Sequence, residues 1–528
     1  MGAVLCACVS GANRDVVESA APPDPFHDLL LSDSACRQTT PAALRRSDVL
    51  ADLDVLKRLL VQGYAGFDAA AQAGADWRTS LGRLRRTLAS SPSVIPAESV
   101  RNLIIQHLAF TRDRHLGVWL MDEEGHVDWM GCGAHQDAYA TDIVVTKDAQ
   151  RLKVVSSADP RVPPGALLNR CEDADVASLL HRTVVGESLQ GAFLLLRLST
   201  SVPTPLRCSF EVPGKSQVTS VLPFHRIRST STEPRQGLPA VDRHNGNVTR
   251  LRVRTLDLSS ASVALSTFVA TARELRSETA VILDVRGNSG GSDTPVADWF
   301  AGITNTTFKA PAVHALHSNV TLQGAVNTAR CDLLRAQDAP ARDSLTAWLT
   351  DGQRALADAA HNPRPRAWKS QQRARSGNAP SAFGGALVVL ADARCASSCE
   401  SAVTHARQLE RTLVVGENTS GSGTFGELFM YRLPRTGLGV SVPSAWLHHS
   451  SQDVAFEGRG HLPDIWLDTE DAANVAERLA LCLADVACEA RLEAFAAQAT
   501  GVFMARSRPE AARGPLTLSN TSRTTAAD

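Results

Sequence analysis

The sequence predicts a mixed α/β protein with a layered core, which follows a helical region and a region rich in strands. Three observations predict this class. Apolar residues recur at helical spacing over 41–117, short apolar runs separated by Gly, Pro and Asp fill 118–240, and nearly continuous Val, Ile and Leu runs alternate with helical patterns over 245–470. Such alternation is typical of buried, partly parallel strands that are covered by helices.

Residues 1–40 are expected to form a leader and linker. The start, MGAVLCACVSGANRD, is apolar and rich in small residues, as is the end of a secretory leader. LCAC, which ends at Cys8, resembles a bacterial lipoprotein cleavage box; the alternative interpretation is a disordered N-terminus. The 11 cysteines, with pairs such as Cys171 and Cys208, favour export to the periplasm or the extracellular space, although their pairing stays open. We therefore expect an exported protein, and a lipid anchor on Cys8 if the box is processed.

The region 41–117 is predicted to be a small helical domain. Leucines at helical spacing lead up to Gly63, where the first helix closes. Asp76 can cap a second helix, and Pro96 suits the first turn of a third. The region ends in the sequence TRDRHLG.

The region 118–240 is predicted to be a β-rich intervening domain, with runs such as GVWLM and SVLPF. Within the core, 301–380 is an insertion whose basic end, HNPRPRAWKSQQRARSGNAP, is interpreted as a solvated loop rather than an anion-binding patch. A helix rich in Ala and Leu is predicted over 471–504. The tail 505–528 lacks periodicity and is predicted to be disordered.

Length and charge limit the classes of function. The 528 residues allow roughly two to four domains. The 54 basic and 55 acidic residues leave a net charge of −1 without a dominant run of one sign, which argues against nucleic acid as a partner. The best apolar run, GAFLLLRL, is interrupted by Arg197, so we expect no transmembrane segment.

Two adjacent serines, Ser397 and Ser398, lie where the apolar run ALVVLAD meets a predicted helix. A serine hydroxyl attacks efficiently only when a base accepts its proton and donors stabilise the oxyanion. N–H groups at the helix start can be such donors, and Gly290 and Gly291 in VILDVRGNSGG allow a second strand end to approach a substrate closely. The alternative interpretation is that the serines only cap the helix and the glycines form an ordinary turn.

Four motifs in order, VILDVRGNSGG, CASSCE, GENTSGSGT and EGRGHLPDI, resemble those of the C-terminal processing (tail-specific) peptidase family, which includes the tricorn core. The likeness covers roughly 245–470, and the helical region that ends in RDRHLG also resembles the N-terminal segment of that family. The resemblance implies a crotonase/ClpP-like layered core and a serine-type endopeptidase that acts on proteins or peptides without a metal or organic cofactor. In relatives, the place of 118–240 is often taken by a PDZ domain, which captures substrate C-termini by strand addition.

The resemblance also implies roles for individual residues. The nucleophile would be Ser397, three residues before Glu400. The N–H of Ser398, together with that of Gly290 or Gly291, would stabilise the oxyanion.

The base distinguishes two branches of this family. The processing-protease branch uses a lysine in the glycine-rich turn after the next strand, but Ser422 occupies that position in TSGSGT. The tricorn-like branch uses a histidine from the N-terminal region and a glutamate that orients it, and here DRH supplies His115 and EGRGHLPD supplies Glu457. Arg114 stands where the tricorn pattern has a serine. A Ser–His–Glu relay is chemically reasonable because neutral imidazole accepts a proton and a carboxylate fixes its tautomer.

Alternatives stay open on the sequence alone. His448 and His449 are rival bases because they are close in sequence to Glu457. The cysteines of CASSCE and the nearby His405 lack a second ligand pair with metal-binding spacing, so buried or disulfide-bonded cysteines are favoured. The alternative function is a non-catalytic ligand- or peptide-binding protein on the same fold. Acyl-thioester chemistry rests on fold analogy alone.

Overall fold

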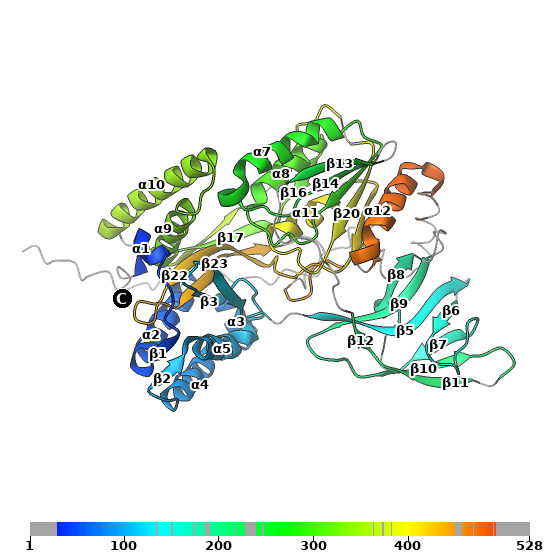
Figure 1. The fold of residues 1–528 in the computed structure, drawn as a ribbon, viewed down its shortest axis with the longest axis horizontal. Helices are drawn as coiled ribbons and strands as arrows, with labels where there is room; N and C mark the ends of the chain where they lie inside the picture. The colour runs from blue at the N-terminus through cyan, green and yellow to red at the C-terminus, as the bar shows by residue number, and fades with distance from the viewer. Residues whose placement is uncertain are drawn as a thin grey trace, which may run out of the picture.

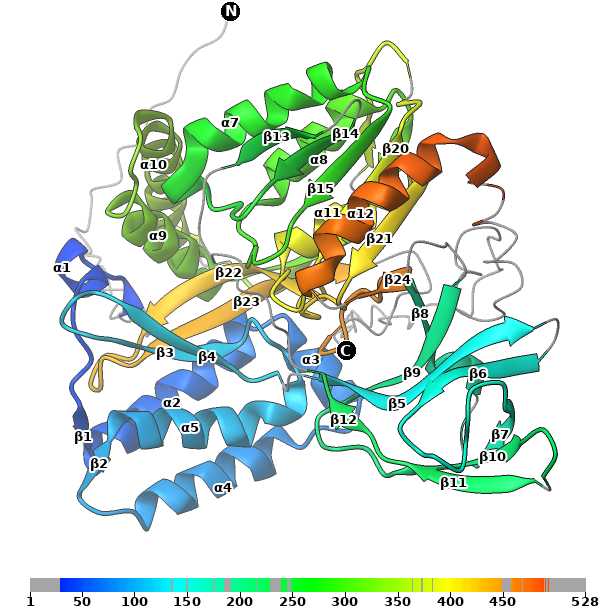
Figure 2. The same cartoon turned by 45° about the vertical axis from the view of Figure 1, so that its right-hand side comes forward.

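The fold is described from a computed structural model (Figure 1, Figure 2). It covers residues 29–492 except 134–135, 149–150, 173, 175, 185–190, 216, 228–238, 245–247, 363, 372–373, 382, 449–456, 468, 489 and 491. Within the leader and linker predicted for 1–40, the cleavage box that ends at Cys8 lies outside the described residues, whereas Asp33–Cys36 form a helix. The disorder prediction for 505–528 also lies outside the described residues. Among the described helices, none combines the length and the apolar character that a bilayer crossing requires.

The N-terminal region is helical, as predicted. Asp76 caps the second of the three longer helices, because its carboxylate accepts the N–H of Thr79. Pro96 lies one position before the predicted helix, as the N-cap residue. The elements are α1 (Asp33–Cys36), α2 (Arg46–Gly63), α3 (Gly66–Gln72), α4 (Trp77–Ala89), α5 (Ala97–Leu108), η2 (Ala109–Thr111) and the ribbon of β1 (Ala43–Arg45) with β2 (Val94–Pro96).

An antiparallel sheet joins this region to the core. Its strand order is β18-β17-β23-β3-β4, with β22 beside β23, and β3 pairs antiparallel with β23. Figure 2 shows β22 and β23 between the N-terminal helices and the core. The strands are β3 (Gly117–Met121), β4 (Val127–Gly131), β17 (Ala312–His317), β18 (Ala367–Gln371), β22 (Phe425–Arg432) and β23 (Gly439–His448). This pairing brings the chain just before β3 against the core.

The predicted β-rich region, 118–240, is divided in the structure, because β3 and β4 belong to the antiparallel sheet of β17 and β23. The strands from 137 onward form a separate sheet in the order β11-β10-β7-β6-β5-β9-β8, which lies to one side in Figure 1. A disulfide between Cys171 and Cys208 links β7 to β10. The elements are β5 (Asp137–Asp148), β6 (Arg151–Ser157), β7 (Leu167–Cys171), α6 (Val176–Leu179), β8 (Leu180–Val184), β9 (Gly191–Ser199), β10 (Leu206–Glu211), β11 (Val218–Leu222) and β12 (His225–Arg226).

The core is a layered α/β structure, which confirms the predicted fold class. Its sheet has the order β13-β14-β15-β20-β21-β24, parallel from β14 to β24. One hydrophobic cluster packs α7, α8 and α11 on one face, and a second packs α12 on the other. The elements are β13 (Ala240–His244), β14 (Val248–Arg252), α7 (Leu258–Leu275), β15 (Ala280–Asp284), α8 (Asp293–Ile303), β20 (Ala386–Ala391), α11 (Ser398–Ala406), β21 (Thr412–Gly416), β24 (Ile465–Trp466) and α12 (Thr469–Ala484).

The insertion 301–380 contains two helices and three strands of its own besides β17. Its basic end is exposed at β18, as predicted, but it is paired with β17 as a strand and is not a loop. The elements are β16 (Thr307–Lys309), α9 (Asn319–Leu333), α10 (Ala339–His361) and β19 (Ala374–Ser376). A disulfide between Cys36 and Cys331 ties α1 to α9.

Candidate active site

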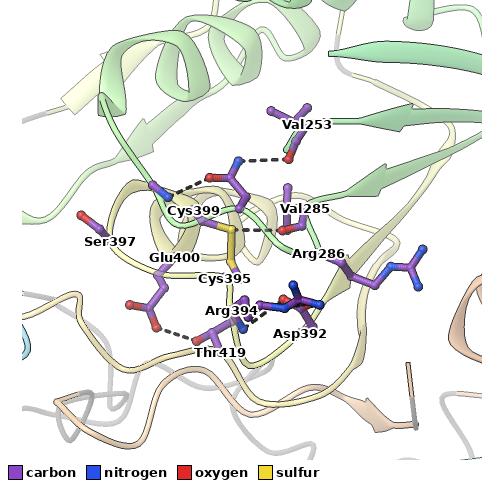
Figure 3. Close-up of a disulfide and its surroundings, with 12 residues drawn as sticks. Val253, Val285, Arg286, Asp392, Arg394, Cys395, Ser397, Cys399, Glu400 and Thr419 are labelled. Atoms are coloured by element: carbon purple, nitrogen blue, oxygen red, sulfur yellow. Dashed lines mark hydrogen bonds and ion pairs between the residues drawn. A yellow bond between two sulfur atoms is a disulfide. The ribbon is translucent and has the colours of Figure 1, made fainter. Parts of the chain in front are cut away.

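The predicted nucleophile lies at a sharp turn between a buried strand and a helix. Ser397 follows β20 and is the N-cap residue of α11, with φ 56° and ψ −124°. A non-glycine residue rarely adopts this region, and such conformations gather at functional sites. The Ser397 hydroxyl has no hydrogen-bond partner among the described residues, and Figure 3 shows it pointing away from the neighbouring disulfide. The turn thus presents a partly exposed hydroxyl at the start of a helix.

Ser422 holds the backbone of this turn. The Ser397 N–H donates to Ser422 Oγ at 3.0 Å, and the same hydroxyl donates to Glu400 Oε2 at 3.2 Å. Glu400 is buried, and it also accepts hydrogen bonds from Thr419 Oγ1 and from the N–H groups of Gly421 and Ser422. Burial raises the pKa of Glu400, while these hydrogen bonds oppose the rise. The position that carries a lysine in one branch therefore carries a structural hydroxyl here.

The predicted oxyanion donors surround Ser397. Ser398 is the first residue of α11, where an N–H has no partner within the helix, and no described group accepts it. The Gly290 N–H is already used, since it donates to Asn288 Oδ1 at 2.8 Å. The N–H of Gly291 has no such partner among the described residues, and its carbonyl accepts the Ser398 hydroxyl at 2.9 Å. Of the two glycines, Gly291 is therefore the one whose N–H is free to donate.

Gly290 is required for another reason. Its φ is 100°, and a Cβ built there would lie 2.8 Å from Ser397 Cβ and 2.7 Å from the Ala396 carbonyl oxygen. The glycine lets the two loops of the site pack backbone against backbone. At the end of β15, just before this loop, Asp284 accepts hydrogen bonds from Arg254 and Arg286.

His115 lies between η2 and β3, in a turn that Asp113 shapes. The Asp113 carboxylate accepts the N–H groups of His115 at 2.7 Å and of Leu116 at 3.2 Å. Burial and the charge of Arg114 lower the pKa of His115 to about 4, against the opposing influence of Asp293. The imidazole is therefore neutral at neutral pH, as a general base must be.

The His115 ring is not hydrogen-bonded to the other proposed catalytic side chains among the described residues. Its Nδ1 is buried without a hydrogen-bond partner, and no hydrogen bond joins the ring to Ser397 or to Glu457 among the described residues. Asp293, whose charge acts on the ring, begins α8 directly after the Gly290–Gly291 turn, and it accepts the hydroxyl of Ser401. The ring thus lies within electrostatic reach of Asp293 at the N-terminus of α8.

Glu457 binds the backbone next to His115 and not the imidazole. Its Oε1 accepts the Arg114 N–H at 2.9 Å, and its Oε2 accepts the Thr424 N–H at 3.2 Å. Burial and the nearby Asp113 raise the pKa of Glu457 well above its ordinary value. The Arg114 guanidinium donates to the carbonyl and, at 2.6 Å, to the hydroxyl of Ser420. The loop before β3 and the loop after β21 are therefore joined at two points.

Other predicted alternatives stand as follows. The side chain of His448 and the whole of His449 lie outside the described residues. Cys395 and Cys399 form a disulfide, so neither is a free thiol. The His/Cys/Asp/Glu group with metal-ligand spacing that is found among the described residues is an exposed one, Asp122, Glu124 and His126, in the turn between β3 and β4.

Sequence reasoning missed the roles of Asp113 and of Ser422. Ser422 was considered only as the residue at the lysine position, and no role was assigned to the aspartate of the D-R-H motif. An Asp two residues before His115 can accept backbone N–H groups within a turn, which is a signal that the sequence did contain.

Comparison with known proteins gives one family match. Residues 251–467 match peptidase family S41. A comparison with curated protein sequences finds no match. Similar solved structures include mature CPAF, with 15% identity and a TM-score of 0.44 over 84% of this chain and 97% of that one.

Two further structures are similar at the same level. The photosystem II D1 C-terminal processing protease has 16% identity and a TM-score of 0.35, over 84% of this chain and 98% of that chain. The tricorn protease has 13% identity and a TM-score of 0.35, over 85% of this chain and 37% of that chain. Values this low carry no inference about substrate or catalytic residues. The family match identifies residues 251–467 as a domain of peptidase family S41, a serine peptidase family, and the ordered motifs of this domain resemble those of the C-terminal processing peptidases.

Proposed function

We propose that this chain is a serine endopeptidase in which Ser397 attacks the peptide carbonyl and His115 accepts its proton. The observation that carries the proposal is the conformation of Ser397. Its hydroxyl stands free at a left-handed turn, next to the uncommitted N–H groups of Ser398 and Gly291. A partly exposed hydroxyl beside two unpaired donors is the arrangement that acyl transfer requires.

The proposed reaction proceeds by general acid–base catalysis. His115 takes the Oγ proton as the Ser397 oxygen bonds to the carbonyl carbon, and the two N–H groups of Ser398 and Gly291 receive the developing oxyanion. His115 then gives the proton to the leaving amine, and water hydrolyses the acyl-enzyme by the same steps. The imidazole must approach Ser397 when substrate binds, as catalytic hydrogen bonds often tighten only in the complex.

Glu457 is proposed to act on His115 through the backbone. Its hydrogen bond to the Arg114 N–H fixes the loop that carries the imidazole, and its second bond, to Thr424, connects that loop to the loop of Ser422. This arrangement supports the proposal that the chain is closer to the histidine-base, tricorn-like branch than to the Ser–Lys branch, because Ser422 offers no amine.

We also propose that the protein is exported. The described residues contain four disulfides, which persist in oxidising compartments such as the periplasm or the extracellular space. The lipid anchor on Cys8 stays a prediction. Mass spectrometry of the N-terminal peptide from the membrane fraction tests it.

A fluorophosphonate probe tests the catalytic proposal. We expect wild type to be labelled, Ser397→Ala to be unlabelled and His115→Ala to be labelled far more slowly. Ser266→Ala, on the exposed face of α7, is the matched control and should react as wild type does. A folded wild type that takes up no probe would instead favour the alternative, a non-catalytic binding protein on this fold.

A further inference from the structure

A disulfide closes the turn that holds the proposed nucleophile. Cys395 and Cys399 are bonded across a sequence separation of 4, and Ser397 is the middle residue of the closed loop (Figure 3). Both cysteines are 0% exposed and belong to the hydrophobic cluster under α11. The bond is thus buried in the core, and the loop that it closes carries the proposed nucleophile.

The two cysteines are anchored on opposite sides of the turn. Cys395 lies in the loop after β20, where its N–H donates to the Asp392 carbonyl at 3.0 Å and its own carbonyl accepts the Ser420 N–H at 2.8 Å. Cys399 is the second residue of α11, and its N–H donates to the Ala396 carbonyl at 3.1 Å. The disulfide therefore ties the strand-side loop to the helix around Ser397.

We propose that Cys395 and Cys399 are positioning residues for the peptidase reaction. This inference rests on the proposed function, since it needs Ser397 as the nucleophile. A left-handed serine persists only when its surroundings over-determine it. Without the cross-link the turn can relax, and the Ser397 hydroxyl and the Ser398 N–H lose their fixed relation. The disulfide keeps both in the orientation that one tetrahedral intermediate requires.

A second disulfide separates positioning from simple stabilisation. The bond between Cys171 and Cys208 spans a sequence separation of 37, in the sheet of β5 to β11. A cross-link that closes a longer loop restricts the unfolded chain more, so its removal is expected to lower stability more than removal of the short one. If the short bond acts by positioning, its removal should nevertheless lower the catalytic rate more than removal of the bond between Cys171 and Cys208.

The test compares two double variants in the full chain. Cys395→Ala/Cys399→Ala removes the short bond, and Cys171→Ala/Cys208→Ala is the control. We measure the maximal rate and half-saturation of fluorophosphonate labelling, kcat and KM on fluorescein-labelled casein, and urea unfolding. For the short-bond variant we expect kcat and the maximal labelling rate to fall about 10- to 100-fold with little change in KM. The control should keep kcat while it unfolds at a lower urea concentration than the short-bond variant.

Three results would overturn the inference: wild-type reactivity of the short-bond variant, an unlabelled wild type, or failure of both short-bond variants to fold. If the folded short-bond variant reacts at the wild-type rate, the bond does not position Ser397, although the proposed function stands. If wild type is itself unlabelled, the proposed function fails, and with it the inference. If the double-alanine variant does not fold, Cys395→Ala/Cys399→Val replaces it to refill the apolar volume. Failure of both to fold, with a folded control, makes the bond a stabilising element and not a positioning one.

Discussion

Ser422→Ala is the most direct perturbation of the site that spares the proposed catalytic groups. The Ser422 hydroxyl accepts the Ser397 N–H at 3.0 Å and donates to Glu400 Oε2 at 3.2 Å. Without it, the Ser397 N–H loses its acceptor, while Glu400 keeps the Ser422 N–H at 2.7 Å. A neutral hydrogen bond contributes about 1 kcal/mol and one to a charged group somewhat more. We therefore expect the free energy of unfolding to fall by about 2 kcal/mol.

The catalytic effect of the same change is expected to be separate from the stability effect. The Ser397 N–H bond is one of the restraints on the left-handed turn, so its loss should misorient the hydroxyl in part of the population. We expect the maximal rate of fluorophosphonate labelling to fall about tenfold, which corresponds to about 1.4 kcal/mol of transition-state stabilisation. Urea unfolding measures the first quantity and labelling under native conditions the second. Ser422→Thr keeps a hydroxyl and should retain both.

One result would refute this reasoning. If Ser422→Ala loses stability as expected but reacts with the probe at the wild-type rate, the hydroxyl supports the fold and not the nucleophile. Equal losses in Ser422→Ala and a well-folded Ser422→Thr would likewise show that the hydrogen bonds are not the cause.

Further predictions concern the other residues of the site. Because His115 must be neutral and its pKa is lowered to about 4, kcat/KM should fall on the acid side near pH 4 and not near 6.5. Arg114→Ala should move this fall to higher pH, because it removes a positive charge that lowers the pKa of His115. Gly290→Ala should abolish labelling because its Cβ would meet Ser397, whereas Gly384→Ala, which has open space, should be neutral in the same assay. Asp113→Asn should keep activity because it preserves the acceptor for the His115 N–H, and Asp113→Ala should lower kcat.

The core of the fold could be predicted because its signal is local. The runs that became β15, β20 and β21 are apolar except for Asp284 and Thr412 at strand ends, and every residue in them is buried. Parallel strands that are covered by helices on both faces need such continuous runs, so composition alone indicates them. The helix start at Asp76 was predictable for the same reason, because the cap lies three residues from the N–H that it accepts.

The partners of the edge strands could not be predicted. β3 and β4 follow the helical region and look like the start of the β-rich region, yet β3 pairs with β23 more than 300 residues later, as Val118 opposite Val440. An alternating pattern fixes which face of a strand is buried, but it carries no information about which strand lies beside it. For the same reason the contact between Glu457 and the Arg114 N–H could not be predicted, because it depends on that distant strand pairing.

The replacement of a serine by Arg114 has a physical reason in the acidic surroundings. Glu400 and Asp113 are fully buried, and their negative charges add to burial in raising the pKa of Glu457. The Arg114 guanidinium interacts favourably with Glu400 and Glu457, and its bonds to Ser420 hold it beside the loop that both carboxylates contact. A serine could offer a hydrogen bond there but no compensating charge. The departure from the tricorn pattern therefore fits a site that keeps its glutamates, and the same positive charge adds to the effect of burial in lowering the pKa of the neighbouring His115.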